Sequence, residues 1–414
     1  MTDDDELDLR NFGGQKKKRT AFAQSDTGKQ LMTALIDAVR REESAGTVER
    51  FPHHKFRTLL LSGNICGGCT VQDTYTGELL RFVCDAVLIA TGGLHGLFGD
   101  TTGSLANTGE VTAELFRLGV PMANLEMIQY HPTTVELGEK RMLLSEAARG
   151  EGGRLFALRN GKPWYFMEEK YPELGNLMPR DITAREVWTV SRDYEVFLDM
   201  TELPKEVMEH KLAGLVDDCQ TYLHKDIRKE PIPILPGIHY FMGGIQVDER
   251  HRTSMRNLYA AGECCAQYHG ANRLGGNSLL GAIYGGQIAA ETACRETVSS
   301  PNMPCAEESL LPELSPDAQM QMNRILLNAL GVVRDAQTLE AGIQEIRKLS
   351  GTLPLLGCAM LESALARKES RGAHWRADYP QRNDAVYCKT TVAHWNGQHI
   401  AISFESIPKR RHDL

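Results

Sequence analysis

Apolar residues recur with the periods of helices and strands along the first third of the chain. Every fourth position from Leu31 to Val39 is apolar, which predicts an amphipathic helix over residues 29–42, capped near Asp26 or Thr27. Strands are predicted at residues 56–61, 79–83 and 86–90. The last of these runs is apolar without alternation, as in a strand that is buried on both faces. It ends in Thr91-Gly92-Gly93, where the backbone can approach a ligand closely.

The remainder of the chain changes pattern more than once. Further helices are predicted to begin near Thr108, at Asn277-Ser278 and after Pro301. Residues 131–238 are rich in loops and prolines, and we expect them to form an inserted lobe. Residues 317–371 have helical periodicity in about three pieces, which are broken near Gly331 and Pro354. A helical part is therefore expected to follow an α/β part.

Composition and charge exclude several classes of function. With 414 residues the chain is too long for one simple core, so two or three lobes are expected. The net charge of −8, from 46 basic and 54 acidic residues, leaves no electrostatic footprint for nucleic acid. Ten scattered cysteines suit a reducing compartment. No apolar run approaches the roughly 20 residues that span a bilayer and no leader opens the chain, so we expect a cytoplasmic protein.

Two cysteine motifs are weak candidates for chemistry. Cys66-Gly-Gly-Cys69 has the spacing of redox or zinc sites, but no second pair or histidine follows at zinc-finger spacing. We expect its two glycines to form the turn of a hairpin between two strands. Cys264-Cys265 is interpreted as a pair of small packing residues beside Glu263. No metal site is predicted.

Charged residues in glycine-rich turns are stronger candidates. Glu146 and Arg149 lie three apart after Ser145, face the same side of a helical turn, and are followed by glycines. Arg180 precedes a capped helix, and His131 is held extended before a proline. Each has a structural alternative, which is an ion pair that stabilises a turn or helix start, or a structural histidine. Together, these alternatives leave the concentration of charge in glycine-rich turns unexplained.

The stretch from His239 to Gly286 is the most informative part of the chain. It reads H-Y-F-M-G-G, then A-A-G-E-C-C, then H-G-A-N-R-L-G-G-N-S-L-L-G-A-I-Y-G-G, and it ends at a helix start. Glycines let a backbone approach a ligand, and a helix N-terminus with free N–H groups binds carboxylate or phosphate. We interpret the stretch as a floor for an anionic ligand that lies against a flat cofactor.

Nearly all of the chain resembles the flavoprotein subunits of the succinate dehydrogenase and fumarate reductase family, which also includes L-aspartate oxidase. The motifs that carry the resemblance are F-G-G-Q (12–15), A-T-G-G (90–93), H-P-T (131–133), E-A-A-R-G-E-G-G (146–153), P-R-D (179–181), H-Y (239–240), H-G-A-N-R-L-G (269–275), R-K-E-S-R-G-A-H (367–374) and D-Y-P (378–380). It implies an α/β fold, in which an N-terminally truncated, Rossmann-like FAD-binding domain has an inserted α+β capping domain and a C-terminal helical domain. The implied segments are 1–128 (FAD-binding domain, first part), 129–238 (capping domain), 239–305 (FAD-binding domain, second part) and 306–414 (C-terminal helical domain).

The resemblance also implies roles for the residues of the substrate site. The two carboxylates of a C4 dicarboxylate would be held by His131, Ser145, His239 and Arg273. Arg180 would carry the proton to or from the substrate carbon, relayed by Glu146 and Arg149, while hydride moves between the flavin and the neighbouring carbon. An arginine acid is expected only in a dry site that is crowded with other positive groups. Those groups would be His131, His239, Arg149 and Arg273.

FAD is the cofactor that the resemblance implies. Its binding residues would be Ala90, Thr91, Gly92, Gly93, Asn107, Gly109, Glu263, Arg273, Ser278 and Leu279. Glu263 would bind the sugar-alcohol chain of the cofactor. The possible partners are an iron–sulfur subunit and a membrane-anchor subunit, which would hold the chain peripherally on the cytoplasmic face of the inner membrane.

Two departures from the family pattern matter. The family begins with a strand–turn–helix unit whose G-x-G-x-x-G motif seats the FAD pyrophosphate, and this motif does not occur in the chain. We hypothesise that Met1 is an internal methionine and that the chain is truncated or misstarted. Tight, stoichiometric FAD, seen by absorbance near 450 nm, would contradict the idea that the missing unit is needed. The second departure is Ser145, where dehydrogenases usually have Thr, and it keeps the hydroxyl.

The motifs leave more than one function open. The R-L-G-G-N-S-L-L-G-A-I run from Arg273 and the pair Gly152-Gly153 favour the succinate/fumarate branch, because aspartate oxidases usually have Ala at both glycine positions and Glu after Leu-Leu. Glu146-Ala147 is closer to the oxidase pattern. A third possibility is a catalytically inactive fragment that depends on another chain, because exposed strand edges favour association.

Overall fold

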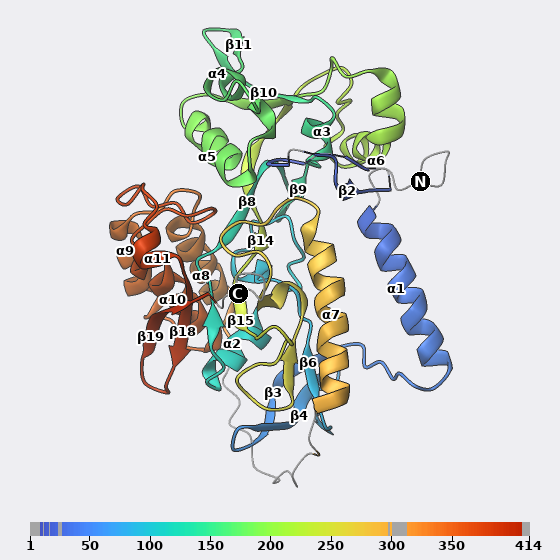
Figure 1. Ribbon diagram of the computed structural model, residues 1–414, viewed down its shortest axis with the longest axis vertical. Helices are drawn as coiled ribbons and strands as arrows, with labels where there is room; N and C mark the ends of the chain where they lie inside the picture. Colours follow the sequence, from blue (N-terminus) through green and yellow to red (C-terminus); the bar gives the residue numbers. More distant parts are fainter. Residues whose placement is uncertain are drawn as a thin grey trace, which may run out of the picture. The chain divides into compact units, whose positions relative to one another are not determined.

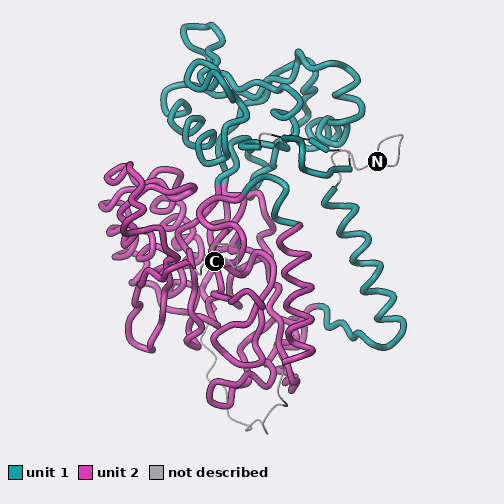
Figure 2. The backbone as a smooth tube through the Cα atoms, viewed as in Figure 1, with its two compact units in different colours: residues 1–52, 130–237, 274–279 teal, residues 53–129, 238–273, 280–414 magenta. Residues whose placement is uncertain are grey.

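The computed structural model describes residues 9–10, 12–15, 17–23, 27–296, 299 and 313–407. The chain forms two compact units, coloured teal and magenta in Figure 2. Unit 1 consists of residues 1–52, 130–237 and 274–279, and unit 2 of residues 53–129, 238–273 and 280–414. The chain passes from one unit into the other within β8 (Ile128–Leu137), β14 (Leu235–Phe241) and α7 (Asn277–Glu296). None of the described helices is long and apolar enough to cross a membrane.

Unit 1 packs short helices against a small antiparallel sheet. Its strands are β1 (Leu9–Arg10), β2 (Thr20–Ala21), β9 (Lys140–Leu143), β10 (Arg154–Arg159), β11 (Lys162–Trp164), β12 (Val196–Asp199) and β13 (Ile232–Pro233). Its helices and helical turns are α1 (Thr27–Ser44), α3 (Ala147–Gly150), α4 (Phe166–Lys170), η2 (Gly175–Leu177), α5 (Arg180–Ser191), η3 (Val207–Lys211), α6 (Ala213–Asp218) and η4 (Cys219–Leu223). The sheet has the order β11-β10-β12-β13. Its core joins Leu155 and Leu198 of the sheet to Val187 of α5 and Leu215 of α6.

Unit 2 combines three sheets with the helices of the C-terminal segment. Its strands are β3 (His54–Ser62), β4 (Ile65–Asp73), β5 (Leu79–Val83), β6 (Val87–Ile89), β7 (Met122–Ala123), β15 (Gly244–Gln246), β16 (Leu258–Ala260), β17 (Cys265–Ala266), β18 (Lys389–Trp395) and β19 (Ile400–Ser406). Its helices and helical turns are η1 (His95–Leu97), α2 (Glu110–Arg117), η5 (Gly262–Cys264), α8 (Pro316–Ala329), α9 (Ala336–Ile346), α10 (Thr352–Ala366) and α11 (Asp384–Tyr387). The sheets have the orders β3-β4-β5, β16-β6 and β17-β15-β7-β18-β19.

The C-terminal segment contains a hairpin as well as the expected helices. Helix α10 packs on α9, α2 and the β18–β19 hairpin, and β18 pairs with β7 through Val392 and Ala393 (Figure 1). The predicted break near Gly331 is confirmed, since it falls between α8 and α9. The predicted break near Pro354 is also confirmed, since α9 ends at Ile346 and α10 begins at Thr352. Pro354 itself lies in the first turn of α10, where a missing N–H leaves no helical bond unmade.

The predicted hairpin turn at Cys66-Gly-Gly-Cys69 is wrong. These residues lie inside β4, the middle strand of its sheet, and the chain turns earlier, between Ser62 and Ile65. Gly68 has a φ of +143°, and a Cβ there would lie 1.9 Å from the carbonyl oxygen of Phe82 on β5. Glycine is therefore required by the close approach of a neighbouring strand rather than by a turn.

Other predicted elements have the expected positions but differ in burial. Helix α1 covers the predicted residues 29–42, but it has no buried residue, and Val39 is 44% exposed. The suggested cap Asp26 lies outside the described residues. Strand β6 is not buried on both faces, because Leu88 is 42% exposed. The predicted boundary at residues 305–306 also lies outside the described residues, and the four-segment domain division stays a prediction.

Candidate functional site

Glu146 is the centre of a buried cluster of charges in unit 1. The side chain is 2% exposed, and its Oε2 accepts hydrogen bonds from Nε and Nη2 of Arg180 at 2.9 and 2.6 Å. Its Oε1 accepts from Nη2 of Arg149 at 3.0 Å and from the backbone N–H of Gly13 at 3.2 Å. The first turns of α3 and α5 therefore direct their arginines at one carboxylate. Sequence spacing predicted the pair of Glu146 with Arg149 but not the pair of Glu146 with Arg180.

Two glycines leave room for this carboxylate. A Cβ on Gly13 would lie 2.6 Å from Oε1 of Glu146, and a Cβ on Gly275 would lie 2.5 Å from its Oε2. Both distances are shorter than any van der Waals contact. The cluster thus joins residues from the N-terminal segment, α3, α5 and the segment before α7, and this convergence has no signal in local sequence.

The charges of the cluster fix its protonation. Burial raises the pKa of Glu146, but the nearby charges of Arg180 and Arg149 outweigh it and lower the pKa to about 2. Burial lowers the pKa of Arg149, and the charge of Arg180 lowers it further against the attraction of Glu146. Glu146 is therefore ionised at neutral pH. A carboxylate flanked by two guanidiniums has a net positive charge, which suits an anionic ligand.

His131 and Ser145 lie in the same unit as this cluster. His131 is fully buried, and its Nδ1 lies 3.2 Å from the carbonyl oxygen of Thr133. Ser145 is half-buried, and its Oγ accepts from the backbone N–H of Ala147 at 3.3 Å, as expected for a residue that starts a helical turn. Both side chains are held by backbone groups next to them in sequence.

Arg273 and His239 lie in unit 2. Arg273 is 3% exposed, and its guanidinium carbon lies 4.4 Å from the ring centre of Tyr240, a cation–π contact that the sequence did not indicate. Nδ1 of His239 lies 2.8 Å from Oγ1 of Thr102. His269 lies edge-on to Tyr240, and burial together with the charge of Arg273 lowers its pKa to about 4. His269 is consequently neutral at neutral pH, so the positive charge of this loop comes from Arg273 and not from His269.

A second group in unit 2 surrounds the turn after β6. Strands β6 and β16 are parallel and end side by side at Ile89 and Ala260, so Ala90-Thr91-Gly92-Gly93 and Glu263 leave the same end of the pair. Ligands commonly bind beyond the carboxyl ends of parallel strands. Gly92 has a φ of +73°, and a Cβ there would lie 2.6 Å from Nδ2 of Asn107. Asn107 thus packs directly on this turn.

Glu263 is oriented by its neighbours and has a free acceptor. Its Oε1 accepts from the backbone N–H of Phe241 at 2.9 Å and lies 3.4 Å from Nε2 of His95, while a Cβ on Gly93 would lie 2.6 Å from it. No described residue donates a hydrogen bond to its other oxygen, Oε2, and the side chain is 20% exposed. This acceptor fits the hydroxyl groups of a sugar-alcohol chain. Sequence reasoning found Glu263 but missed His95 and Phe241, which hold it.

The remaining predicted cofactor residues are divided between the units. Gly109, with a φ of +79°, starts α2 in unit 2. Ser278 and Leu279 lie in the first turn of α7, in the part that belongs to unit 1. The structure therefore assembles three groups of predicted residues. One is the charge cluster around Glu146 in unit 1, and the other two are the residues around Glu263 and around Arg273 in unit 2.

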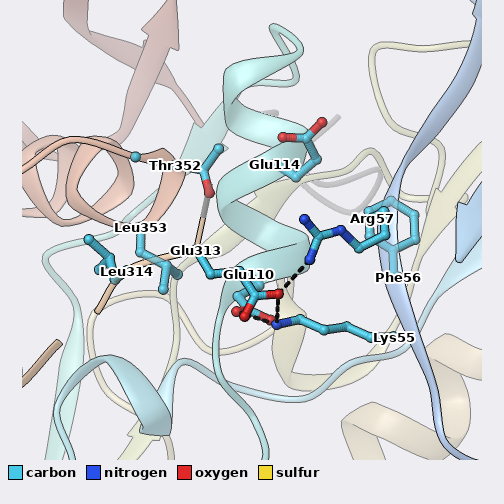
Figure 3. Close-up of a pocket in the computed structure, with 10 residues that line it drawn as sticks. Lys55, Phe56, Arg57, Glu110, Glu114, Glu313, Leu314, Thr352 and Leu353 are labelled. Carbon is cyan, nitrogen blue, oxygen red and sulfur yellow. Dashed lines mark hydrogen bonds and ion pairs between the residues drawn. The ribbon is translucent and has the colours of Figure 1, made fainter. Parts of the chain in front are cut away.

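A further pocket in unit 2 is lined by charged side chains that already form ion pairs with one another. Figure 3 shows Lys55 and Arg57 of β3 directed toward acidic side chains of α2 and of the segment before α8. Nζ of Lys55 lies 2.8 Å from carboxylate oxygens of both Glu110 and Glu313, and Arg57 also pairs with Glu313. Glu114 is bound by Thr58 and Arg117. We assign no ligand to this pocket.

Two family models match the chain. Residues 2–279 match the FAD binding domain model, and residues 351–412 match the model described as the fumarate reductase flavoprotein C-terminus. The first match covers more than half of the chain.

Curated relatives include both dehydrogenases and reductases. The chain is 37% identical to the succinate dehydrogenase flavoprotein subunit of Bacillus subtilis, over 96% of this chain and 77% of that protein. It is 33% identical to the fumarate reductase flavoprotein subunit of Mycobacterium tuberculosis, over 94% and 77%. It is also 30% identical to the L-aspartate oxidase of Streptomyces coelicolor, over 94% and 74%.

Solved structures have the same fold. A variant of E. coli quinol fumarate reductase superposes with a TM-score of 0.87 at 26% identity, over 99% of this chain and 80% of that chain. Mycobacterium smegmatis Sdh1 gives a TM-score of 0.80 at 25% identity, over 99% and 78%. The expected α/β fold, with its FAD-binding and C-terminal parts, is confirmed.

Proposed function

The chain belongs to the succinate dehydrogenase and fumarate reductase flavoprotein family of FAD-dependent oxidoreductases, and from this premise we propose that it interconverts succinate and fumarate. The observation that carries the proposal is the buried cluster in which Glu146 binds Arg180 and Arg149. Such a cluster is costly to bury unless its charges are used or fully paired.

Four residues are proposed to bind the substrate. They are His131 and Ser145 of unit 1 and His239 and Arg273 of unit 2. The planar guanidinium of Arg273 matches the two oxygens of a carboxylate, and its ring contact with Tyr240 limits its rotation. The cation–π contact and the bonds to Thr133 and Thr102 support the proposal, because they orient three of these side chains before a ligand binds.

Arg180 is proposed to move the proton. Bound FAD supplies or accepts the hydride at one carbon of the substrate. In fumarate reduction Arg180 donates a proton from its guanidinium to the neighbouring carbon, and Arg149 and Glu146 return a proton to it. The low pKa of Glu146 keeps this carboxylate ionised, so that it holds the Arg180 fork in place.

FAD itself is proposed to lie against the turn after β6. The contacts would come from Ala90, Thr91, Gly92, Gly93, Asn107, Gly109, Glu263, Arg273, Ser278 and Leu279. The acceptor left on Glu263 supports a bond to the sugar-alcohol chain. An iron–sulfur subunit and a membrane-anchor subunit are proposed as electron-transfer partners, at the cytoplasmic face of the inner membrane.

L-Aspartate oxidase is the second candidate, since Glu146-Ala147 resembles the oxidase pattern and an oxidase is among the relatives. Purified protein with FAD should be assayed for succinate oxidation with an artificial acceptor and for peroxide formation with L-aspartate. We expect succinate-dependent reduction of the acceptor. Peroxide from L-aspartate without succinate oxidation would favour the oxidase, and flavin-loaded protein that is inactive with both would favour an inactive fragment.

A further inference from the structure

A turn in the C-terminal segment holds the loop that carries Arg273. Residues 371–374 form this turn, closed by hydrogen bonds between Arg371 and His374 at 2.8 and 3.1 Å. The N–H of Ala373, at the tip, donates to the carbonyl oxygen of Ala271 at 2.8 Å. Ala271 is two residues before Arg273, so the turn binds the backbone of the loop that carries this charged group.

The tip of the turn admits only glycine at residue 372. Gly372 has a φ of +54°, which side chains rarely adopt. A Cβ there would lie 2.4 Å from the carbonyl oxygen of Ala271 and 3.0 Å from its Cβ. Because the obstacle is backbone, the loop itself would have to move to accommodate a side chain.

Buried ion pairs anchor the turn. Nε and Nη2 of Arg371 donate to the two oxygens of Glu369 at 2.7 and 3.0 Å, and Glu369 is fully buried. Glu369 also binds Arg367, whose Nε donates to the buried carboxylate of Glu126 at 2.8 Å. The turn is thus fixed to the segment just before β8.

A residue of β8 also binds the loop. Nε2 of Gln129, on β8, donates to the side-chain oxygen of Asn272 at 2.9 Å and to the carbonyl oxygen of Arg273 at 2.7 Å. Ala373 packs with Met127, and both belong to the hydrophobic cluster that includes Tyr240, the ring beneath Arg273. The loop is therefore held at each of three successive residues.

We infer that the turn 371–374 is a positioning device that sets the place of the Arg273 guanidinium, with Gly372 as its critical residue. The inference rests on the proposed role of Arg273 as a carboxylate ligand. A shift of about 1 Å in a binding group can cost up to roughly a hundredfold in rate, so a displaced loop has a measurable effect.

The test compares Gly372→Ala with Gly397→Ala in FAD-loaded protein. Gly397 also has a positive φ, of +93°, but a Cβ added there would meet nothing within 4 Å, so its replacement strains the backbone without a collision. We expect Gly372→Ala to raise the KM for fumarate about tenfold while bound flavin stays as in the control. Hydrogen exchange of the amides of residues 269–273 should become faster only in Gly372→Ala.

A double variant separates positioning from general damage. In an Arg273→Lys background, where the planar fork is already lost, Gly372→Ala should add almost nothing to the KM. Should Gly372→Ala not fold, Arg371→Lys weakens the anchor while keeping the charge beside Glu369, and the same rise in KM is expected.

The outcomes distinguish this inference from the proposed function. If Arg273→Lys leaves the affinity for fumarate unchanged, the proposed role of Arg273 is wrong. If Arg273→Lys weakens binding but Gly372→Ala matches Gly397→Ala, or adds its full effect in the double variant, the positioning role is overturned and the proposed function stands.

Discussion

At the scale of single residues, the proposed mechanism depends on one buried carboxylate, that of Glu146. The sequence predicted that Glu146 and Arg149 face the same side of a turn, because residues three apart do so in any helix. It did not predict that Arg180 shares the same carboxylate, or that Gly13 and Gly275 enclose it. Those contacts join distant segments and depend on tertiary packing, for which local spacing has no signal.

The low pKa of Glu146 makes a prediction about stability. Its pKa is about 4.5 in an unfolded chain and about 2 in the fold, so this carboxylate stabilises the protein above pH 4.5 and the contribution disappears as the pH falls through 2. Glu146→Gln removes it at all pH values. The difference in unfolding free energy between wild type and variant should shrink by about 3 kcal/mol between these limits.

Urea unfolding at a series of pH values measures this difference. Glu195→Gln, at an exposed position of unit 1, is the control and should show no comparable change. A difference for Glu146→Gln that stays constant with pH would show that the carboxylate is not held by the two arginines.

At the scale of elements, helix α7 shows that neighbouring glycines of one helix can have different surroundings. The sequence predicted that this helix begins at Asn277-Ser278, and α7 begins at Asn277. Two adjacent glycines of this helix, Gly285 and Gly286, differ in their surroundings. A Cβ on Gly285 would lie 2.8 Å from the ring of His251, which is fully buried and bound at both nitrogens. A Cβ on Gly286 would meet nothing within 4 Å.

Alanine at these two positions should therefore have opposite effects. Gly286→Ala should stabilise unit 2 by up to roughly 1 kcal/mol, because alanine is the better helix former. Gly285→Ala should destabilise it by roughly 1–3 kcal/mol through overpacking. Thermal unfolding compares the midpoint temperatures of the two variants with that of the wild type. Equal shifts of the same sign in both variants would contradict the packing described for Gly285.

Other elements show where sequence patterns fail. The glycines of β4 were misinterpreted as a turn because Gly-Gly is compatible both with a turn and with the close approach of a strand. The β18–β19 hairpin was missed because its pairing partner, β7, is distant in sequence. Helices α8 and α9 were predictable from their hydrophobic periods, and each begins with a side-chain cap, from Ser315 and Asp335 respectively.

At the scale of the molecule, a buried ion network ties the C-terminal segment into unit 2. All five N–H groups of Arg367 are used. They donate to Glu126, Glu369, Thr391 and the carbonyl oxygens of Tyr387 and Lys389. The sequence offered the motif but not its partners, because Glu126 is far away along the chain. The segment matched by the C-terminal family model is thereby joined to Glu126, two residues before β8.

Removing Arg367 should be far more damaging than removing an exposed arginine. Arg367→Met leaves the buried carboxylate of Glu126 without its arginine and removes one of the two arginines that bind Glu369, so it should cost roughly 3–5 kcal/mol. Arg382→Met removes a pair with Asp384 in which both side chains are more than half exposed, and should cost less than about 1 kcal/mol. Urea unfolding compares them, and a small loss for Arg367→Met would mean that the network is not needed for stability.

We propose that Arg180, held by Glu146, carries the proton between the buried Glu146–Arg149 pair and the dicarboxylate. The most direct measurement is the turnover number for fumarate reduction by Arg180→Lys, with Arg185→Lys on the same helix as control. Lysine keeps the charge beside Glu146, so the fold and flavin binding should survive. We expect turnover to fall roughly 10²–10⁴-fold in Arg180→Lys and to stay unchanged in Arg185→Lys. Unchanged turnover in flavin-loaded Arg180→Lys would contradict the proton-transfer role.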